Sequence, residues 1–266
     1  MEIKSRFEFF RRNNVTYLDS AATTQVPDLV IRSVKQTLQY RGNPSRSAHI
    51  VSLRNEELIK KSRANIAKFI GAQTEEIAFF GNATGALNLA VDSIADLIKK
   101  DDEIIISVSE HNSNMLPYLK LAKRGANIHI VGLKDGIISI DEIKKTLNNR
   151  TKIVAIGHCS NVLGNINEVE EIGRIIKAHN KDILYFIDGT QAVAHIPVNV
   201  KNIKADFYAF SSHKMYGPDG VGVLYISKGM HHLLTPTQVG GGTVKNVAIT
   251  YGKKKDIISP EYHQSL

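Results

Sequence analysis

The chain has 266 residues, of which 42% are hydrophobic and 23% charged, a balance that is ordinary for a folded globular protein. Its formal net charge of +8 fits a basic surface or an electropositive cleft for an anionic cofactor. The Lys and Arg residues are scattered and no nucleic-acid-binding motif is present, so we expect no nucleic-acid partner. The single cysteine, Cys159, excludes an intrachain disulfide, and no apolar stretch reaches the length of a membrane span, so we expect a cytoplasmic protein without a membrane partner.

The first quarter of the chain predicts a lead-in and two helices. Residues 1–24 form a polar, partly aromatic lead-in segment. A turn at Pro27 begins a helical pattern, whose predicted apolar face carries Leu29, Val30, Val34 and Leu38. Residues 41–49 are rich in Gly, Pro and Ser and predict a loop, and an amphipathic helix follows from about Leu53 to Ile70.

From residue 77 onward, short apolar runs alternate with helical patterns. Strands are predicted at 77–80, 103–108, 127–131, 152–156, 183–187, 207–210 and 221–226. Helices are predicted at 86–98, from residue 114 through 122, at 141–147 and at 168–179. This alternation predicts an α/β fold with a mainly parallel sheet and helices on both faces.

Polar clusters follow five of the predicted strands. They are Gly81–Gly85, Ser109–Asn114, Ser160–Gly164, Asp188–Gln191 and Ser211–Lys214. In parallel α/β sheets, ligands bind at the carboxyl ends of the strands. We therefore predict a site at this edge.

Two charged residues in these clusters are candidates for chemistry. Lys214 lies on a tight connection after a buried strand, where desolvation favours an amine nucleophile able to form a Schiff base; the alternative is a solvated loop lysine. Asp188 ends an apolar strand, so its carboxylate needs a cationic partner such as a pyridinium nitrogen, or it caps a following helix.

Three further features each leave two interpretations open. The helix start at Thr84 and Gly85 offers backbone N–H groups to an anion, or is a plain capping turn. His111 stacks on a flat ring, or is a loop histidine with its hydrogen bonds satisfied. Cys159 beside His158 allows a catalytic pair, but adjacent residues of a strand point to opposite faces, so we expect a buried, structural cysteine. No Cys/His spacing resembles a metal site.

The polar motifs together resemble one family. Ser211–Gly222, with the sequence SSHKMYGPDGVG, is similar to the cofactor-lysine segment of the cysteine desulfurases within the class V aminotransferases, which use pyridoxal 5′-phosphate. The likeness extends over nearly the whole chain, through Tyr17–Thr23, Gly42–Ser45 with His49, Asn82–Thr84 with Asn88 and Leu89, Glu110–Asn114, Ser160–Gly164, Asp188–Gln191 and Gly240–Gly242. The resemblance implies the large domain of a fold-type I pyridoxal-phosphate enzyme.

The resemblance also implies a role for each matching residue. Lys214 would bond to the cofactor and move a proton, and Asp188 would pair with the pyridine nitrogen. His111 would stack on the ring and assist proton transfer. Gln191 would bind the phenolate oxygen, with Asn161 near the substrate carboxylate. The expected phosphate ligands are Thr84, Gly85, Ser211 and His213.

The implied reaction converts L-cysteine to L-alanine and passes sulfur to an acceptor protein, as in iron–sulfur cluster supply. We expect a homodimer, because active sites of this family borrow residues from a second subunit. The resemblance leaves two alternatives open: another class V aminotransferase or epimerase-like enzyme, and a truncated homologue without catalytic activity.

The sequence departs from the family at its end. The family's nucleophilic cysteine and a carboxylate-binding arginine lie in a C-terminal small domain, beyond the region that corresponds to Leu266, and Cys159 matches no catalytic position. A fragment, a naturally short protein or a chain completed by another polypeptide would each explain this. We predict a lead-in (1–24), a cofactor-binding large domain (25–245) and the start of an incomplete C-terminal region (246–266).

Overall fold

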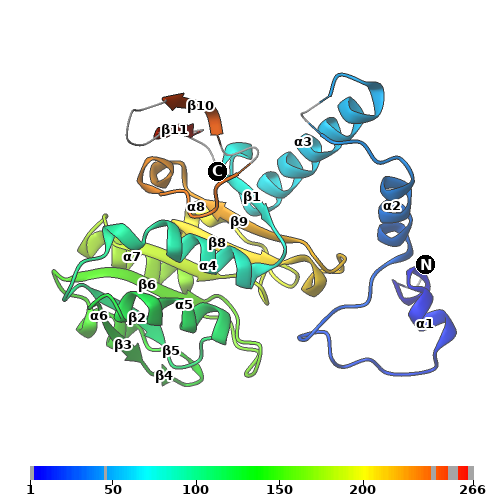
Figure 1. Ribbon diagram of the computed structural model, residues 1–266. Coiled ribbons are helices and arrows are strands. Elements are labelled where there is room, and N and C mark those ends of the chain that lie inside the picture. The colour runs from blue at the N-terminus through cyan, green and yellow to red at the C-terminus, as the bar shows by residue number, and fades with distance from the viewer. Residues whose placement is uncertain (1–2, 45–46, 241–243, 251–256, 263–266) are drawn as a thin grey trace.

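The computed structural model describes residues 3–44, 47–240, 244–250 and 257–262, and a seven-stranded sheet forms its centre (Figure 1). The sheet order is β1-β9-β8-β7-β6-β2-β3. The strands in this order are Ile77–Phe80, Gly222–Ile226, Phe207–Ser211, Leu184–Asp188, Thr151–Gly157, Glu103–Ser107 and Asn127–Val131. Only β9 runs antiparallel to its neighbours, so the other six strands end at the same edge.

Helices cover both faces of this sheet, as predicted. The helices α4 (Ala83–Ser93) and α5 (Asn112–Ala122) pack on one face, against side chains such as Phe186. The other face packs against α3 (Ile50–Ile70), α6 (Ile140–Thr146), α7 (Val169–His179) and α8 (Val200–Ile203). All five residues of β7 are buried, and the first four are a continuous apolar run because both faces of the strand are covered.

Several short elements complete the described structure. They are the 3₁₀ turns Ile3–Arg6, Thr74–Glu76, Ala95–Leu97, Ser212–Lys214 and Lys228–Leu233, and the small hairpin of β4 (Leu133–Lys134) with β5 (Ile137–Ile138). The turn Ser212–Lys214 follows β8 directly, so it lies at the carboxyl edge of the sheet.

The N-terminal helices α1 (Glu8–Arg12) and α2 (Asp28–Gln39) stand apart from the sheet (Figure 1). The prediction of a helix after Pro27 is confirmed, but α2 has no buried residue. Leu29 and Leu38, on its predicted apolar face, are 68% and 60% exposed. Helical periodicity therefore identified the helix correctly, although that face does not pack against the described sheet.

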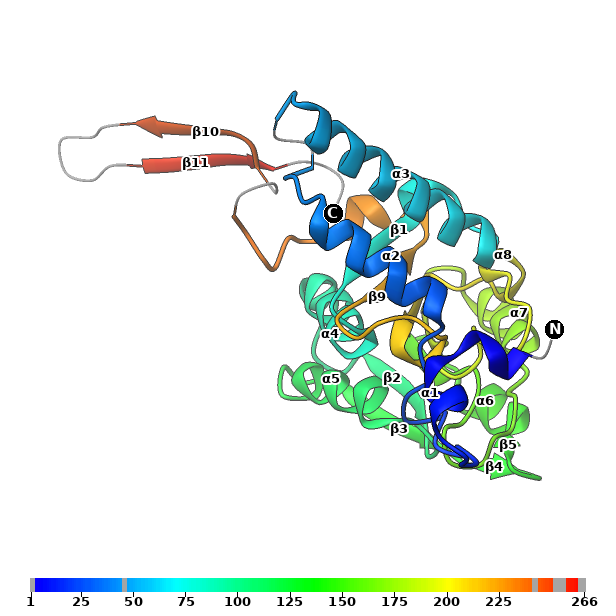
Figure 2. The ribbon, with the colours of Figure 1, turned by 90° about the vertical axis from the view of Figure 1, so that its right-hand side faces the viewer.

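An antiparallel hairpin of β10 (Val244–Thr250) and β11 (Ile257–Tyr262) projects from the body (Figure 2). The sequence did not predict this hairpin, because Lys and Asp residues interrupt the apolar pattern there. Gly241 and Gly242 of the glycine segment lie outside the described residues, and the division of the chain at 24 and 245 stays a prediction. Within the described ranges, each helix is too short or too polar to span a lipid bilayer.

Candidate active site

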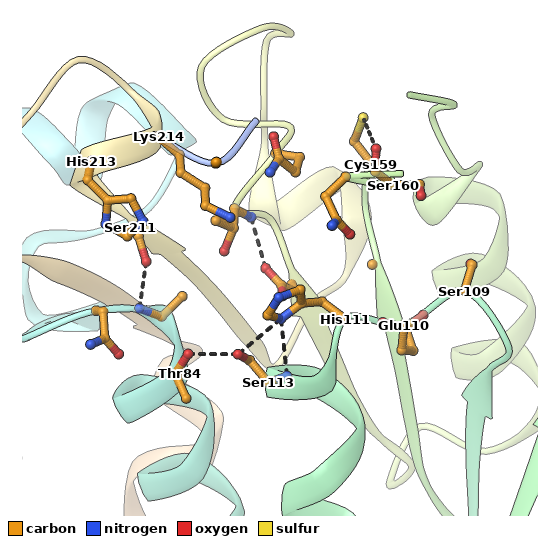
Figure 3. A pocket seen from close by; sticks show the side chains of 18 of the residues that line it. Thr84, Ser109, Glu110, His111, Ser113, Cys159, Ser160, Ser211, His213 and Lys214 are labelled. Atoms are coloured by element: carbon orange, nitrogen blue, oxygen red, sulfur yellow. Dashed lines mark hydrogen bonds between the residues drawn. The ribbon is translucent and has the colours of Figure 1, made fainter. Parts of the chain in front are cut away.

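The five polar clusters meet around one cavity of about 270 Å³ at the carboxyl edge of the sheet (Figure 3). Of the nine predicted site residues, eight line this cavity: Thr84, His111, Asn161, Asp188, Gln191, Ser211, His213 and Lys214. The strand order explains this convergence, because the loops after β1, β2, β6, β7 and β8 all leave from the same edge.

Lys214 closes the turn that follows β8. The carbonyl oxygen of His213 accepts hydrogen bonds from the backbone nitrogen of Thr24 (2.8 Å) and from its Oγ1 (2.9 Å), so the lead-in segment fixes this turn. The Lys214 side chain is partly buried and extends into the cavity (Figure 3). Among the described residues, no carboxylate or hydrogen-bond acceptor contacts its amine.

Asp188, the last residue of β7, is 9% exposed. Its Oδ1 accepts a hydrogen bond from the backbone nitrogen of Thr190 (3.0 Å), which forms a turn and not the start of a helix. No cationic side chain pairs with Asp188 within the described ranges. The buried Oγ1 of Thr190 also has no hydrogen-bond partner there. A buried carboxyl group without a cationic partner and a buried hydroxyl without a hydrogen-bond partner, both on one wall of the described structure, fit a ligand that has a cationic ring nitrogen and polar substituents, as pyridoxal 5′-phosphate has.

His111 caps the N-terminus of α5. Its Nδ1 accepts a hydrogen bond from the backbone nitrogen of Ser113 (3.2 Å) and lies 3.1 Å from the Ser113 hydroxyl. That hydroxyl lies 2.7 Å from Oγ1 of Thr84, at the start of α4 (Figure 3). This chain of contacts holds the imidazole at the cavity wall and leaves Nε2 for a ligand.

The predicted phosphate ligands are only partly brought together. Ser211 Oγ accepts a hydrogen bond from the backbone nitrogen of Ala83 (2.8 Å), which joins β8 to the start of α4. Gly85 does not line the cavity, and its backbone N–H donates to Oδ1 of Asn82 (2.8 Å). The capping interpretation of this helix start therefore accounts for Gly85, while Thr84, Ser211 and His213 remain on the wall.

Gln191 and Asn161 lie on the wall beside the lead-in segment and the loop after β6. Nε2 of Gln191 donates to the carbonyl oxygen of Ala21 (2.7 Å), so its Oε1 is the atom left for other contacts. Asn161 is exposed on the loop that follows Ser160.

Glu110, which is not among the predicted site residues, also lines the cavity. It is 9% exposed, and burial is the main cause that raises the pKa of its carboxyl group to about 7. The polar cluster Ser109–Asn114 was the available signal, but Glu110 stands beside the more conspicuous His111.

The expectation that Cys159 is buried was wrong. This residue is partly exposed at the cavity rim, because the chain leaves β6 at Gly157. Its sulfur faces the carbonyl oxygens of Ser160 and Gly164, each 3.9 Å away, and points away from Lys214 (Figure 3). Partial burial raises the pKa of this thiol, which disfavours the nucleophilic thiolate.

The chain matches known sequences over most of its length. The family model described as aminotransferase class V matches residues 16–259. A probable cysteine desulfurase of Pyrococcus abyssi is 39% identical over 239 residues, which are 88% of this chain and 59% of the relative. A cysteine desulfurase of Wigglesworthia glossinidia brevipalpis is 37% identical over 94% of this chain and 63% of its own length. The chain thus spans about three fifths of the relatives it matches.

Solved structures agree with this assignment. The apo cysteine desulfurase of Thermococcus onnurineus superimposes with a TM-score of 0.88 at 36% identity, covering 92% of this chain and 61% of that one. SspA in complex with cysteine gives a TM-score of 0.79 at 31% identity, over 86% of this chain and 66% of that one. The fold is therefore that of the large domain of these enzymes.

Proposed function

This chain belongs to the class V aminotransferase family, and on that premise we propose that it binds pyridoxal 5′-phosphate and acts on L-cysteine as a desulfurase. The observation that carries the proposal is an amine and a buried carboxyl group that line one cavity and lack partners within the described ranges. The Lys214 amine and the buried Asp188 carboxylate both line it, and neither has an ion-pair partner among the described residues. A cofactor with an aldehyde and a cationic ring nitrogen satisfies both.

When bound, the cofactor supplies an electron sink that lets an attached amino acid lose its Cα proton. Lys214 would hold the aldehyde covalently and provide the amine that moves this proton. Asp188 would keep the ring nitrogen charged, and His111 would cover the ring. Thr84, Ser211 and His213 would receive the phosphate, with Gln191 at the ring's phenolate oxygen and Asn161 at the substrate end.

The choice of L-cysteine is supported by the relatives, which are described as cysteine desulfurases, and by the related structure that contains cysteine. In the proposed reaction the C–S bond of cysteine breaks, the carbon gains a proton to give L-alanine, and the sulfur passes to an acceptor thiol as a persulfide. We propose that this thiol belongs to another polypeptide segment, because the Cys159 sulfur points away from Lys214. A homodimer, a sulfur-acceptor protein and the supply of iron–sulfur clusters belong to the same proposal.

The test is covalent trapping. The full chain is loaded with pyridoxal 5′-phosphate, reduced with borohydride and digested, and the modified peptide is identified by mass spectrometry. We expect one modified lysine, Lys214, and no stoichiometric labelling in Lys214→Ala. Lys134→Ala is the matched control, because Lys134 lies on the small hairpin outside the cavity.

A loaded chain is then given L-cysteine with an acceptor thiol. Alanine and persulfide support the desulfurase, whereas a keto acid or an inverted amino acid indicates another class V reaction. Labelling spread over surface lysines, or equal labelling of Lys214→Ala, would contradict cofactor binding itself.

A further inference from the structure

Glu110 lies beside Asp188 on the same face of the sheet. Gly157, at the end of β6, pairs in parallel register with Asp188, and residues in register on neighbouring strands point to the same face. A Cβ built on Gly157 would lie 3.5 Å from Oε2 of Glu110. The carboxyl group of Glu110 therefore lies over the glycine, next to the side chain of Asp188.

Two hydrogen bonds fix this carboxyl group, and the backbone N–H of Gly157 lies close enough to favour its ionised form. The hydroxyl of Ser107 donates to Oε1 (2.5 Å), and Nδ2 of Asn114 donates to Oε2 (2.6 Å). Both side-chain donors are fully buried. These contacts favour the ionised form, but burial and the charge of Asp188 oppose it, so that the pKa of Glu110 rises to about 7.

The groups that face Glu110 supply no compensating cation. Tyr118 of α5 and Tyr185 of β7 lie nearby, and burial raises the pKa of both phenols well above its usual value, so they are neutral at pH 7. His158, which follows β6, is neutral as well, because burial lowers its pKa to about 4. The potential cations on the cavity wall are His111, His213 and Lys214, and none of them forms an ion pair with Glu110 in the described structure.

We propose that Glu110 and Asp188 form a carboxyl pair, in which Glu110 is partly protonated at pH 7 before the cofactor binds and releases its proton to solvent when a cationic ring nitrogen enters. Glu110 would then be a positioning residue, which adjusts the negative charge on this wall of the cavity to match a cationic ring nitrogen. The inference rests on the proposed function, since it requires a ligand with such a nitrogen in this cavity. Two carboxylates side by side cannot both stay ionised at low cost, and an added cation removes that penalty.

Proton release can be counted without catalysis. The probe is 4′-deoxypyridoxine 5′-phosphate, which has the ring and the phosphate but no aldehyde, so Lys214 cannot bond to it. Calorimetric titration of the full chain at pH 7 in cacodylate and in HEPES, two buffers with different ionisation enthalpies, gives the number of protons released. We expect the unsubstituted protein to release roughly half a proton more than Glu110→Gln, because a group with a pKa near 7 is half protonated at that pH.

Glu110→Gln is the suitable variant because it reproduces the protonated form. Its amide can donate to Oγ of Ser107, which can in turn donate to Oγ of Ser109, 3.0 Å away. Glu171→Gln, at an exposed ion pair on α7, is the matched control and should release as many protons as the unsubstituted protein. Equal release by Glu110→Gln and the unsubstituted protein, or proton uptake in place of release, would overturn the proposal.

Infrared difference spectra of the unsubstituted protein provide a second test if Glu110→Gln fails to fold. Binding of the probe should remove a protonated carboxyl C=O band and produce a carboxylate band, and histidines give no such signal. No carboxyl change would also overturn the proposal. Failure of the probe to bind the unsubstituted protein would instead contradict the proposed function, so the two failures are distinguishable.

Discussion

Buried acidic side chains lie at both edges of the central sheet, but they differ in whether a cationic side chain contacts them. At the amino edge, Asp206 precedes β8 and contacts Lys177 (2.6 Å), while Glu76 precedes β1 and contacts Lys201 (2.5 Å). At the carboxyl edge, Asp188 and Glu110 have no cationic partner among the described residues.

This difference separates structural charges from functional ones. Burying a carboxylate raises the free energy of the folded state unless a cation pairs with it. Buried acids with a structural role are therefore expected to have cationic partners. Unpaired acids reduce the stability of the folded chain unless a ligand provides the missing charge. The carboxyl edge therefore shows where a cationic ligand is expected, and the amino edge is the internal control.

The largest effect is expected from breaking a structural pair. Lys177→Met leaves Asp206 buried without its cation, and we expect a loss of about 3–4 kcal/mol in the free energy of unfolding, measured by urea denaturation. Lys134→Met removes an exposed contact with Asp141 (3.8 Å) and should cost less than about 0.5 kcal/mol. Equal costs in the two variants would show that the amino-edge pair is not structural.

The next effect is a pH dependence at the carboxyl edge. The pKa of Glu110 in the folded chain is about 7, above its ordinary value of 4.5, so its contribution to stability is fully present below pH 4.5 and lost as the pH rises through 7. Without cofactor, the unfolding free energy of the unsubstituted protein relative to Glu110→Gln should fall by on the order of 3 kcal/mol over this range. His158 makes stability rise with pH, because burial lowers its pKa to about 4. Both proteins contain His158, so its contribution cancels when the two unfolding free energies are subtracted. If the unfolding free energies of the two proteins changed with pH in parallel, the raised pKa that is assigned to buried Glu110 would be contradicted.

A smaller effect is expected at the start of α4. Ser211→Ala removes the acceptor for the backbone N–H of Ala83, and because Ser211 is buried we expect a loss of about 1 kcal/mol. Affinity for pyridoxal 5′-phosphate should also fall, because Ser211 is one of the predicted phosphate ligands on the cavity wall. Ser62→Ala is the control on α3, away from the cavity, where the hydroxyl donates only to the carbonyl oxygen of Leu58 in its own helix. Unchanged affinity in Ser211→Ala would remove this residue from the phosphate site.

Much of the fold could be predicted, because fully buried strands such as β7 and β8 are short, continuous apolar runs. The convergence of the strand ends followed from the parallel arrangement, and it located Asp188 and Lys214 on one wall. The antiparallel direction of β9 and the exposure of Leu29 and Leu38 depend on tertiary contacts that periodicity does not record.

Single side chains were harder to place than elements. Gly85 was predicted to bind phosphate, but its N–H is used by the Asn82 cap. Glu110 was overlooked because its importance comes from the absence of a side chain at Gly157, a residue 47 positions away in the sequence (157 − 110). Such features depend on which residues are neighbours in the folded chain and on how deeply they are buried, and neither can be read directly from the sequence.

The most direct test of the contrast between the two edges is the unfolding free energy of Asp188→Asn, with and without pyridoxal 5′-phosphate. Without cofactor, we expect this variant to be as stable as the unsubstituted protein or more so, because an unpaired buried charge is removed and Oδ1 can still accept from Thr190. With cofactor, the unsubstituted protein should gain stability and the variant should gain much less. A loss as large as that of Lys177→Met without cofactor, together with an undiminished gain from pyridoxal 5′-phosphate, would show that Asp188 is a structural acid and would contradict the account.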